Sequence, residues 1–215
     1  MTSPIPPHAG QAVLRGGASL AAARAVVIMI HGRGAGPRNI MDLVPDIGHP
    51  NAAYLAPAAA GGTWYPQSFM APLEQNEPGI SSGISVIHAL IDEVVAAGIP
   101  AERIMLLGFS QGACLASTAA VRRPNRYGAI VVFSGGLIGP PGTTWGENGL
   151  FQSTPAFFGC SDRDAHVPES RVRESAAVLQ RMGALVTTRI YPGMGHLVNE
   201  DETRFAKELL AGLAR

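Results

Sequence analysis

A serine with a glycine two residues to either side stands where the character of the sequence changes. The motif is Gly108-Phe-Ser-Gln-Gly112. Residues 104–107 before it are apolar, as in a buried strand, and residues 113–121 after it are small, as in a packed helix. A sharp strand-to-helix turn needs glycine on both sides and lifts the hydroxyl of Ser110 clear of the sheet. The alternative is a glycine-rich turn without chemistry, but this setting favours a nucleophile.

A serine hydroxyl is a poor nucleophile at neutral pH and needs a base within hydrogen-bond reach. His196 ends the glycine-rich loop Gly193-Met-Gly-His196, which lies between the last predicted strand and the last predicted helix. We expect it to be the base, because functional groups in open α/β sheets follow the carboxyl ends of strands. Other histidines lie in proline-rich segments or on a helix, and we expect solvated or structural roles for His8, His49 and His88.

The base must be oriented by an acceptor, usually a carboxylate, which also stabilises the imidazolium. The loop after another predicted strand offers two candidates, Asp162 and Asp164. Either fits by spacing alone, and we expect the other to form a local salt bridge, for example with Arg163. The chain order of serine, aspartate and histidine is the one expected for the α/β-hydrolase fold.

Acyl transfer also requires hydrogen-bond donors for the developing oxyanion. The backbone N–H of Gln111, next to Ser110, is one predicted donor. The second is the backbone N–H of Arg33 in the loop His31-Gly-Arg-Gly34, which follows an apolar run at 25–30. The glycines of this loop let the main chain approach a substrate closely. A phosphate cradle is the alternative, but no Gly-Lys-Ser/Thr follows to support it.

Aromatic residues in two long irregular loops are candidates for the wall of a substrate pocket. We expect Trp64 and Tyr65 to line it from the first loop and Trp145 from the second. The alternative is that the first two only pin their loop to the core. His166 either faces substrate or hydrogen-bonds its own loop, and Cys114 is expected to pack against the sheet.

The rest of the chain alternates short apolar runs with amphipathic stretches. It predicts strands at 25–30, 52–56, 103–107, 129–133, 156–159 and 186–191, and helices at 39–45, 84–97, 111–121, 169–182 and 200–213. Strands that are apolar throughout indicate an α/β fold, a mostly parallel central sheet with helices on both faces. We expect an N-terminal lead-in at 1–23 and a single α/β-hydrolase domain at 24–215, without a separate lid domain.

Composition limits the classes of partner. Hydrophobic residues make up 47% of the 215 residues and charged residues 15%, which excludes a disordered chain. Sixteen basic residues balance sixteen acidic ones, so the basic footprint of a nucleic-acid binder is missing. Two cysteines without metal-type spacing favour a reduced, cytoplasmic protein with no metal or cofactor. We expect no secretion signal and no membrane insertion, and a homodimer is left open.

Four segments together resemble the phospholipase/carboxylesterase family, which includes the acyl-protein thioesterases. The resemblance runs from about residue 24 to the C-terminus, and the segments are His31-Gly-Arg-Gly34, Gly108-Phe-Ser-Gln-Gly112, Asp164-Ala-His-Val-Pro168 and Gly193-Met-Gly-His196. It implies that Asp164 is the acid, because the family's catalytic acid stands four residues before the proline of this loop. It also implies that the second oxyanion donor is Arg33.

Two positions depart from the thioesterase pattern. Acyl-protein thioesterases carry apolar residues where this chain has Arg33 and His166, which disfavours a long fatty-acyl tunnel. The His31-Gly-Arg-Gly34 form resembles a bacterial branch of small-molecule esterases, and dienelactone hydrolases of the same fold carry cysteine in place of Ser110. The sequence therefore predicts a serine carboxylesterase for small to medium acyl esters that works through an acyl-enzyme. The alternatives are a thioesterase or lysophospholipase with the same triad, or a non-catalytic binding module.

Overall fold

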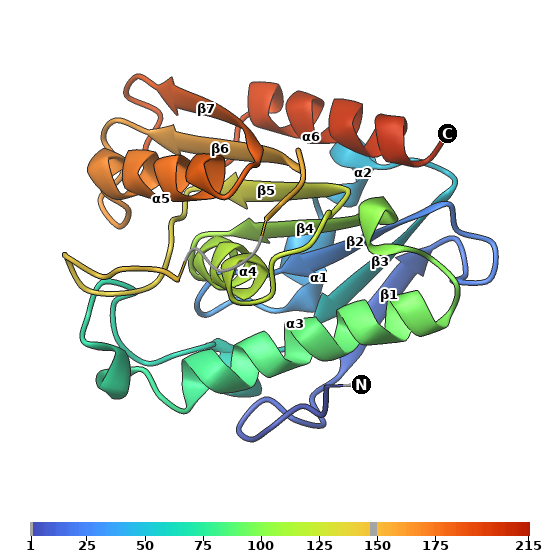
Figure 1. Ribbon diagram of the computed structural model, residues 1–215, viewed down its shortest axis with the longest axis horizontal. Coiled ribbons are helices and arrows are strands. Elements are labelled where there is room, and N and C mark those ends of the chain that lie inside the picture. The colour runs from blue at the N-terminus through green and yellow to red at the C-terminus, as the bar shows by residue number, and fades with distance from the viewer. Residues whose placement is uncertain (1, 147–149) are drawn as a thin grey trace.

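A seven-stranded sheet runs through the centre of the computed structural model, which describes residues 2–146 and 150–215 (Figure 1). Its strand order is β1-β3-β2-β4-β5-β6-β7, and all neighbouring strands are parallel except β1 and β3. The strands are β1 (Val13–Gly17), β2 (Ala25–Ile30), β3 (Ala52–Pro57), β4 (Ile104–Phe109), β5 (Ala129–Phe133), β6 (Pro155–Ser161) and β7 (Leu185–Tyr191). The predicted α/β class with a mostly parallel sheet is confirmed.

Helices cover both faces of the sheet. They are α1 (Pro37–Met41), α2 (Val44–Ile47), α3 (Gly79–Ala96), α4 (Gln111–Arg122), α5 (Glu169–Arg181) and α6 (Glu200–Leu213), with short 3-10 turns at Ala60–Gly62, Leu73–Gln75 and Ala101–Arg103. Helices α3, α4 and α5 pack on one face, and α1, α2 and α6 pack on the other (Figure 1). The carboxyl ends of the parallel strands thus lie at one edge between the two helical layers, where ligands of such sheets bind.

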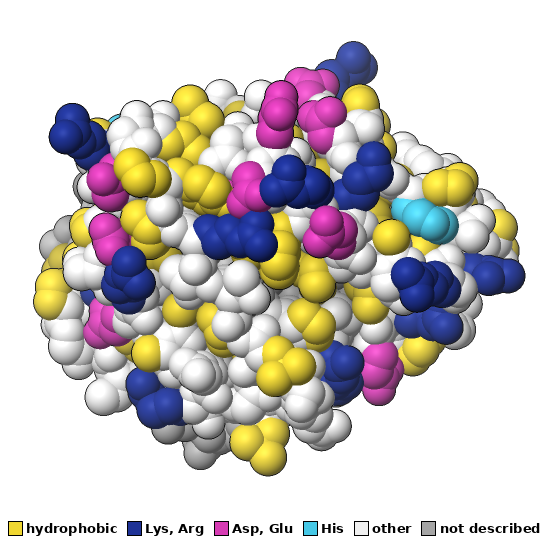
Figure 2. All heavy atoms as spheres, turned by 90° about the horizontal axis from the view of Figure 1, so that it is seen from above, with side chains coloured by type: hydrophobic (Ala, Val, Ile, Leu, Met, Phe, Trp, Pro, Cys, Tyr) yellow, Lys and Arg dark blue, Asp and Glu magenta, His cyan; other side chains and the backbone are white. Residues whose placement is uncertain are grey.

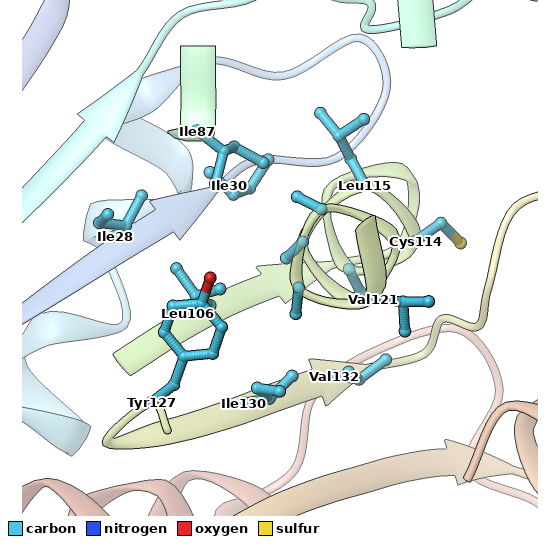
Figure 3. Packing of buried hydrophobic residues seen from close by; sticks show 14 of the residues in the cluster. Ile28, Ile30, Ile87, Leu106, Cys114, Leu115, Val121, Tyr127, Ile130 and Val132 are labelled. Atoms are coloured by element: carbon cyan, nitrogen blue, oxygen red, sulfur yellow. The ribbon is translucent and has the colours of Figure 1, made fainter. Parts of the chain in front are cut away.

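Each central strand contributes to two hydrophobic cores, because successive side chains point to opposite faces of a sheet. In β2, Ile28 and Ile30 belong to the core beneath α3 and α4, while Val27 and Met29 belong to the core beneath α6. Figure 3 shows the first core, with Leu115 of α4 above the strands. Burial on both faces explains why these strands are apolar at every position and gives the site a rigid base.

The N-terminal segment contains a strand that the sequence pattern did not predict. Residues Val13–Gly17 form β1, which pairs antiparallel with β3 at the edge of the sheet. Arg15 and two glycines conceal the alternation by which a strand is usually identified. Only pairing with β3, which is distant along the chain, makes this stretch extended.

The helix predicted from Asn39 to about Pro45 is wrong in its bounds. The structure has two short helices there, α1 and α2, and Asn39 does not cap either of them. The first helix begins at Pro37, whose fixed φ suits a first helical position. Pro45 has no N–H to continue the first helix, which explains the break before it.

Helix α3 begins five residues earlier than predicted, at Gly79 instead of Ile84. Its first turns are rich in glycine and serine, which hide the helical periodicity. A Cβ added to Gly83 would lie 2.7 Å from a methyl group of Leu115 and 3.2 Å from the ring of Trp64. The small residues therefore let α3 approach α4 closely.

Helix α3 also has the length and apolar composition of a membrane span, although we expected no such segment. It is the one helix of this kind in the described part of the chain, and 56% of it is buried inside the fold. Core helices of soluble proteins share this composition. Burial against the sheet and α4 accounts for it here.

Candidate active site

Ser110 stands at the sharp turn between β4 and α4. Its φ of 54° and ψ of −122° are unusual for a residue with a side chain, and strain of this kind occurs at functional sites. A Cβ on Gly108 would overlap the backbone of Gly112, and a Cβ on Gly112 would overlap the carbonyl group of Ile30. The two glycines are therefore required by close backbone packing, and the turn presents the Ser110 hydroxyl at the carboxyl edge of the sheet.

The structure brings Ser110, His196 and Asp164 together from three separate loops. The Ser110 hydroxyl lies 2.9 Å from His196 Nε2, and His196 Nδ1 lies 2.6 Å from Asp164 Oδ2. The other carboxylate oxygen, Asp164 Oδ1, accepts the N–H groups of His166 at 2.8 Å and Val167 at 3.0 Å. One carboxylate thus fixes both its own loop and the orientation of the imidazole.

Burial and hydrogen bonding act in opposite directions on Asp164, whose side chain is fully buried. Burial alone raises the pKa of this carboxyl, but the hydrogen bonds from His196 and from two backbone N–H groups outweigh it and hold the pKa below its usual value. An ionised Asp164 accepts a hydrogen bond from His196 Nδ1–H. This selects the tautomer whose Nε2 is free to accept the Ser110 hydroxyl proton.

Asp162 lies outside this chain of hydrogen bonds. Its Oδ1 accepts the N–H of Gly193 at 2.8 Å, and the hydroxyl of the neighbouring Ser161 accepts the N–H of Gly195 at 3.0 Å. Both contacts hold the loop that ends in the histidine. The expected salt bridge with Arg163 is absent from the described residues, and the role of Ser161 was not foreseen.

The loop that carries Arg33 lies against Ser110. A Cβ added to Gly32 would be 3.5 Å from the Cβ of Ser110. Arg33 N–H makes no hydrogen bond to the backbone of the described residues. Gln111 is the first residue of α4, so its N–H belongs to the donors that a helix leaves without an internal partner. Both predicted oxyanion donors thus border the same cleft as Ser110.

The Gln111 side chain has a second role that sequence reasoning missed. Its Oε1 accepts the N–H of Trp64 at 2.9 Å, and its Nε2 donates to the carbonyl of Tyr65 at 2.8 Å. The indole N–H of Trp64 in turn donates to the carbonyl of His31 at 3.0 Å. The nucleophile turn, the Arg33 loop and the aromatic loop are therefore tied together.

A cleft of about 580 Å³ opens at Ser110 and His196. Tyr65 lines it, whereas Trp64 is fully buried beneath and is not part of the wall. This placement fits the alternative in which Trp64 pins its loop to the core. Trp145 borders a separate hollow, and its indole N–H donates to the carbonyl of Ile138.

His166 combines the two roles considered for it. Its backbone N–H donates to Asp164, while its ring lines the cleft and packs edge-on against the His196 ring, with centroids 4.7 Å apart. His8, His49 and His88 lie elsewhere. Each bonds backbone groups, and His8 is buried, with its ring between Ala60 N–H and the Trp64 carbonyl. A solvated His8 was therefore the wrong alternative.

Comparison with known proteins shows the family of the chain. The phospholipase/carboxylesterase family model matches residues 17–213. The chain belongs to this family. Acyl-protein thioesterase 1 of Saccharomyces cerevisiae is 30% identical over 71% of each chain, and a probable carboxylesterase (SOBER1-like) of Arabidopsis thaliana is 26% identical over 87% of this chain and 78% of that one. A probable rice carboxylesterase is 31% identical over 60% of this chain, and the match spans about half (48%) of its length.

Solved structures agree with the family assignment. A phospholipase/carboxylesterase from Dyadobacter fermentans superposes with a TM-score of 0.90, with 38% identity, over 94% of this chain and 97% of that one. The esterase PE8 superposes with a TM-score of 0.76 at 25% identity, over 94% of this chain and 98% of that one. The fold is that of the α/β hydrolases, and this family member is a carboxylic ester hydrolase.

Two free thiols lie close to the site of this family member. Cys114, on the first turn of α4, lines the cleft instead of packing on the sheet, and Figure 3 shows its side chain turned away from the strands. Cys160 lies 3.7 Å from Asp164. Burial raises the pKa of each thiol to about 12, so both stay protonated at neutral pH and are poor nucleophiles. The described residues contain no group of three or more side chains placed to hold a metal ion.

Proposed function

We propose that the protein is a serine carboxylesterase that hydrolyses small to medium acyl esters through Ser110, His196 and Asp164. The observation that carries this proposal is the continuous hydrogen-bonded chain from the Ser110 hydroxyl through both nitrogens of His196 to a buried carboxylate. Its outer end opens into the cleft. A nucleophile, a base and an orienting acid within hydrogen-bond distance are the parts that covalent acyl transfer needs.

In the first half-reaction, Ser110 Oγ attacks the ester carbonyl carbon while its proton passes to His196 Nε2. The carbonyl π electrons move onto oxygen, and the backbone N–H groups of Arg33 and Gln111 stabilise that oxyanion. When the tetrahedral intermediate collapses, the bond to the alkoxy oxygen breaks and His196 donates its proton to the leaving alcohol. Asp164 stabilises the imidazolium throughout and stays ionised.

In the second half-reaction, water repeats the attack on the acyl-enzyme. His196 accepts a proton from the water, and the hydroxide adds to the acyl carbon. Collapse of this intermediate returns the proton to Ser110 Oγ and releases the carboxylic acid. The enzyme is regenerated without a net change in charge or protonation of the three residues.

The size of the cleft favours small to medium acyl groups. About 580 Å³ holds a small molecule, and its wall includes polar side chains such as Arg33, Asn39 and Gln67. A thioesterase remains the second candidate because a yeast acyl-protein thioesterase is among the relatives. Turnover of p-nitrophenyl butyrate against a palmitoyl thioester separates the two, and we expect the short ester to be favoured.

The test is active-site labelling with a fluorophosphonate probe together with p-nitrophenyl butyrate kinetics. We expect Ser110→Ala to abolish labelling and to lower kcat by at least about a thousandfold. Ser170→Ala, at an exposed position of helix α5, is the matched control and should behave as wild type. Esterase activity that survives Ser110→Ala would assign the nucleophile elsewhere, and a wild-type protein without labelling or turnover would favour a binding module.

A cytoplasmic location and a small-molecule partner complete the proposal. Cys114 and Cys160 are both free and buried, which suits a reducing compartment. Figure 2, a view onto α6 and β7, shows basic and acidic side chains interspersed, unlike the one-sign patch of a nucleic-acid binder.

A further inference from the structure

The cleft contains fixed positive charge without a balancing carboxylate. Its described lining includes Arg33 but no aspartate or glutamate. Asp164 lies behind His196 and is fully occupied by hydrogen bonds from within the protein. A substrate that enters this cleft therefore meets a cation and no competing anion.

Backbone carbonyls, not a carboxylate, hold the guanidinium of Arg33 in the cleft. Its guanidinium donates to the carbonyls of Pro66 at 2.8 Å and Gln67 at 2.6 Å, and it forms no ion pair among the described residues. Six other arginines pair with a carboxylate, namely Arg15, Arg123, Arg171, Arg173, Arg189 and Arg204, whereas Arg126, like Arg33, donates to a backbone carbonyl instead. The carbonyls hold Arg33 in place without cancelling its charge, and the guanidinium keeps further N–H donors for a ligand.

A second donor in the same cleft has no acceptor among the described residues. The Tyr65 hydroxyl is buried and has no hydrogen-bond partner among the described residues, and its polar neighbour is the Cys114 thiol, a weak acceptor. The Arg33 guanidinium carbon lies 5.9 Å from the Tyr65 ring centroid. Buried donors are normally satisfied, so an unpartnered hydroxyl in a cleft wall points to a polar group on the ligand.

We propose that the substrates are esters that carry a second, negatively charged group, a carboxylate, which pairs with Arg33. The Tyr65 hydroxyl donates to a polar oxygen of the same substrate. A carboxylate suits this site because its single charge balances one guanidinium and its two oxygens match the fork of N–H donors. The inference rests on the proposed esterase function and names its substrate class: half-esters of dicarboxylic acids, or acyl esters of hydroxy acids.

Two matched substrate pairs test the proposal and locate the carboxylate. Monoethyl glutarate against ethyl glutaramate places the charge on the acyl side, and 4-acetoxybutanoate against 4-acetoxybutanamide places it on the alcohol side. We expect the carboxylate to raise kcat/KM by about tenfold or more in one pair, a preference that shrinks as NaCl is added. Equal turnover of carboxylate and amide in both pairs at low ionic strength would overturn the proposal.

Variants separate the charge of Arg33 from its contacts with the loop. The readout is the ratio of kcat/KM for carboxylate and amide, because Arg33 also borders the oxyanion site and both values can fall. We expect Arg33→Met to bring the ratio close to one and Arg33→Lys to retain part of the preference. Arg15→Met, on edge strand β1, is the control and should keep the wild-type ratio. A ratio that Arg33→Met leaves unchanged would reduce Arg33 to a brace of the loop and refute charge recognition.

Tyr65→Phe tests the second donor with little change in volume. We expect kcat/KM for the favoured carboxylate ester to fall about fivefold further than kcat/KM for ethyl pentanoate, which has no second polar group. Equal effects on both substrates would remove Tyr65 from the proposal. If wild type hydrolyses ethyl pentanoate and Ser110→Ala does not, the esterase function stands even where the carboxylate preference fails.

Discussion

Two carboxyl groups, one before and one after His196 in the chain, have opposite pKa shifts, and Glu202 is the more deeply buried of them. Asp164 precedes the histidine in the chain, and Glu202 follows it on the first turn of α6. Hydrogen bonds outweigh burial at Asp164 and lower its pKa. At Glu202 burial is the larger effect and raises the pKa to about 7, because the Asn199 N–H is its single described hydrogen-bond donor and Oε1 has none. The balance between the depth of burial and the number of hydrogen-bond donors decides whether such a carboxyl stays charged.

The largest effect on activity is expected from removing the charge of Asp164. Asp164→Asn keeps the shape of the side chain but removes the acceptor that selects the His196 tautomer. We expect kcat for a short p-nitrophenyl ester to fall by about a thousandfold to ten-thousandfold, with little change in the melting temperature. A decrease of only a few fold would mean that another acceptor orients the histidine.

The raised pKa of Glu202 makes the stability of the protein depend on pH. Below pH 4.5, Glu202 is protonated in both folded and unfolded chains. Between that value and about 7 the unfolded chain loses the proton while the folded chain keeps it, so stability falls as pH rises and levels off above 7. Over this pH range the titration of Glu202 lowers the free energy of unfolding by about 3 kcal/mol.

Glu202→Gln removes this titration and keeps an oxygen that can accept the Asn199 N–H. Urea unfolding at pH 5 and pH 8 should therefore show a smaller difference in the variant than in wild type. Glu208→Gln, an exposed position on the same helix, is the control and should leave the wild-type difference in place. Parallel stability curves for wild type and Glu202→Gln would mean that Glu202 is ionised in the folded protein.

The smallest effect is expected at Asp162, an exposed carboxylate that braces the histidine loop through Gly193. Asp162→Asn retains an oxygen that can accept this N–H, so we expect kcat/KM to change by less than about threefold. A loss comparable with that of Asp164→Asn would show that the charge of Asp162 contributes to catalysis. The carboxylate chosen from the family resemblance would then need to be reassigned.

The regular elements were predictable because their signal is local. The strands at 25–30 and 129–133 and the helix at 200–213 have the predicted bounds, since continuous apolar runs and a clear amphipathic period mark them. Strand β1 was missed because its extended form depends on pairing with β3, which is distant in the chain. The structure also places Ser110, Asp164 and His196 at one edge of the sheet, because the strands that precede their loops are parallel and their carboxyl ends lie on the same side.

The hydrogen bonds that hold the loops around the site were less predictable, because they join residues that are far apart in the chain. No local pattern indicates that the Gln111 side chain holds the backbone of Trp64 and Tyr65, or that Ser161 holds Gly195. The aromatic character of Trp64 predicted a pocket wall. Its indole N–H instead donates to the carbonyl of His31, and this hydrogen bond places the ring in the core. Glu202 looked like an ordinary acidic residue of a first helical turn, and only packing against Gly159 buries it.

The two hydrogen bonds from the Gln111 side chain to the backbone of Trp64 and Tyr65, here called the clasp, link reaction rate to substrate range. Protein engineers usually try to alter these two properties separately. The backbone of Gln111 directly follows Ser110, and its side-chain amide holds the backbone of Trp64 and Tyr65 in the loop that borders the cleft. Substitutions at Gln111 will therefore shift reaction rate and substrate range together. A library aimed at new selectivity would do better to vary Tyr65, Phe69 or Asn39, which border the cleft and leave the clasp intact.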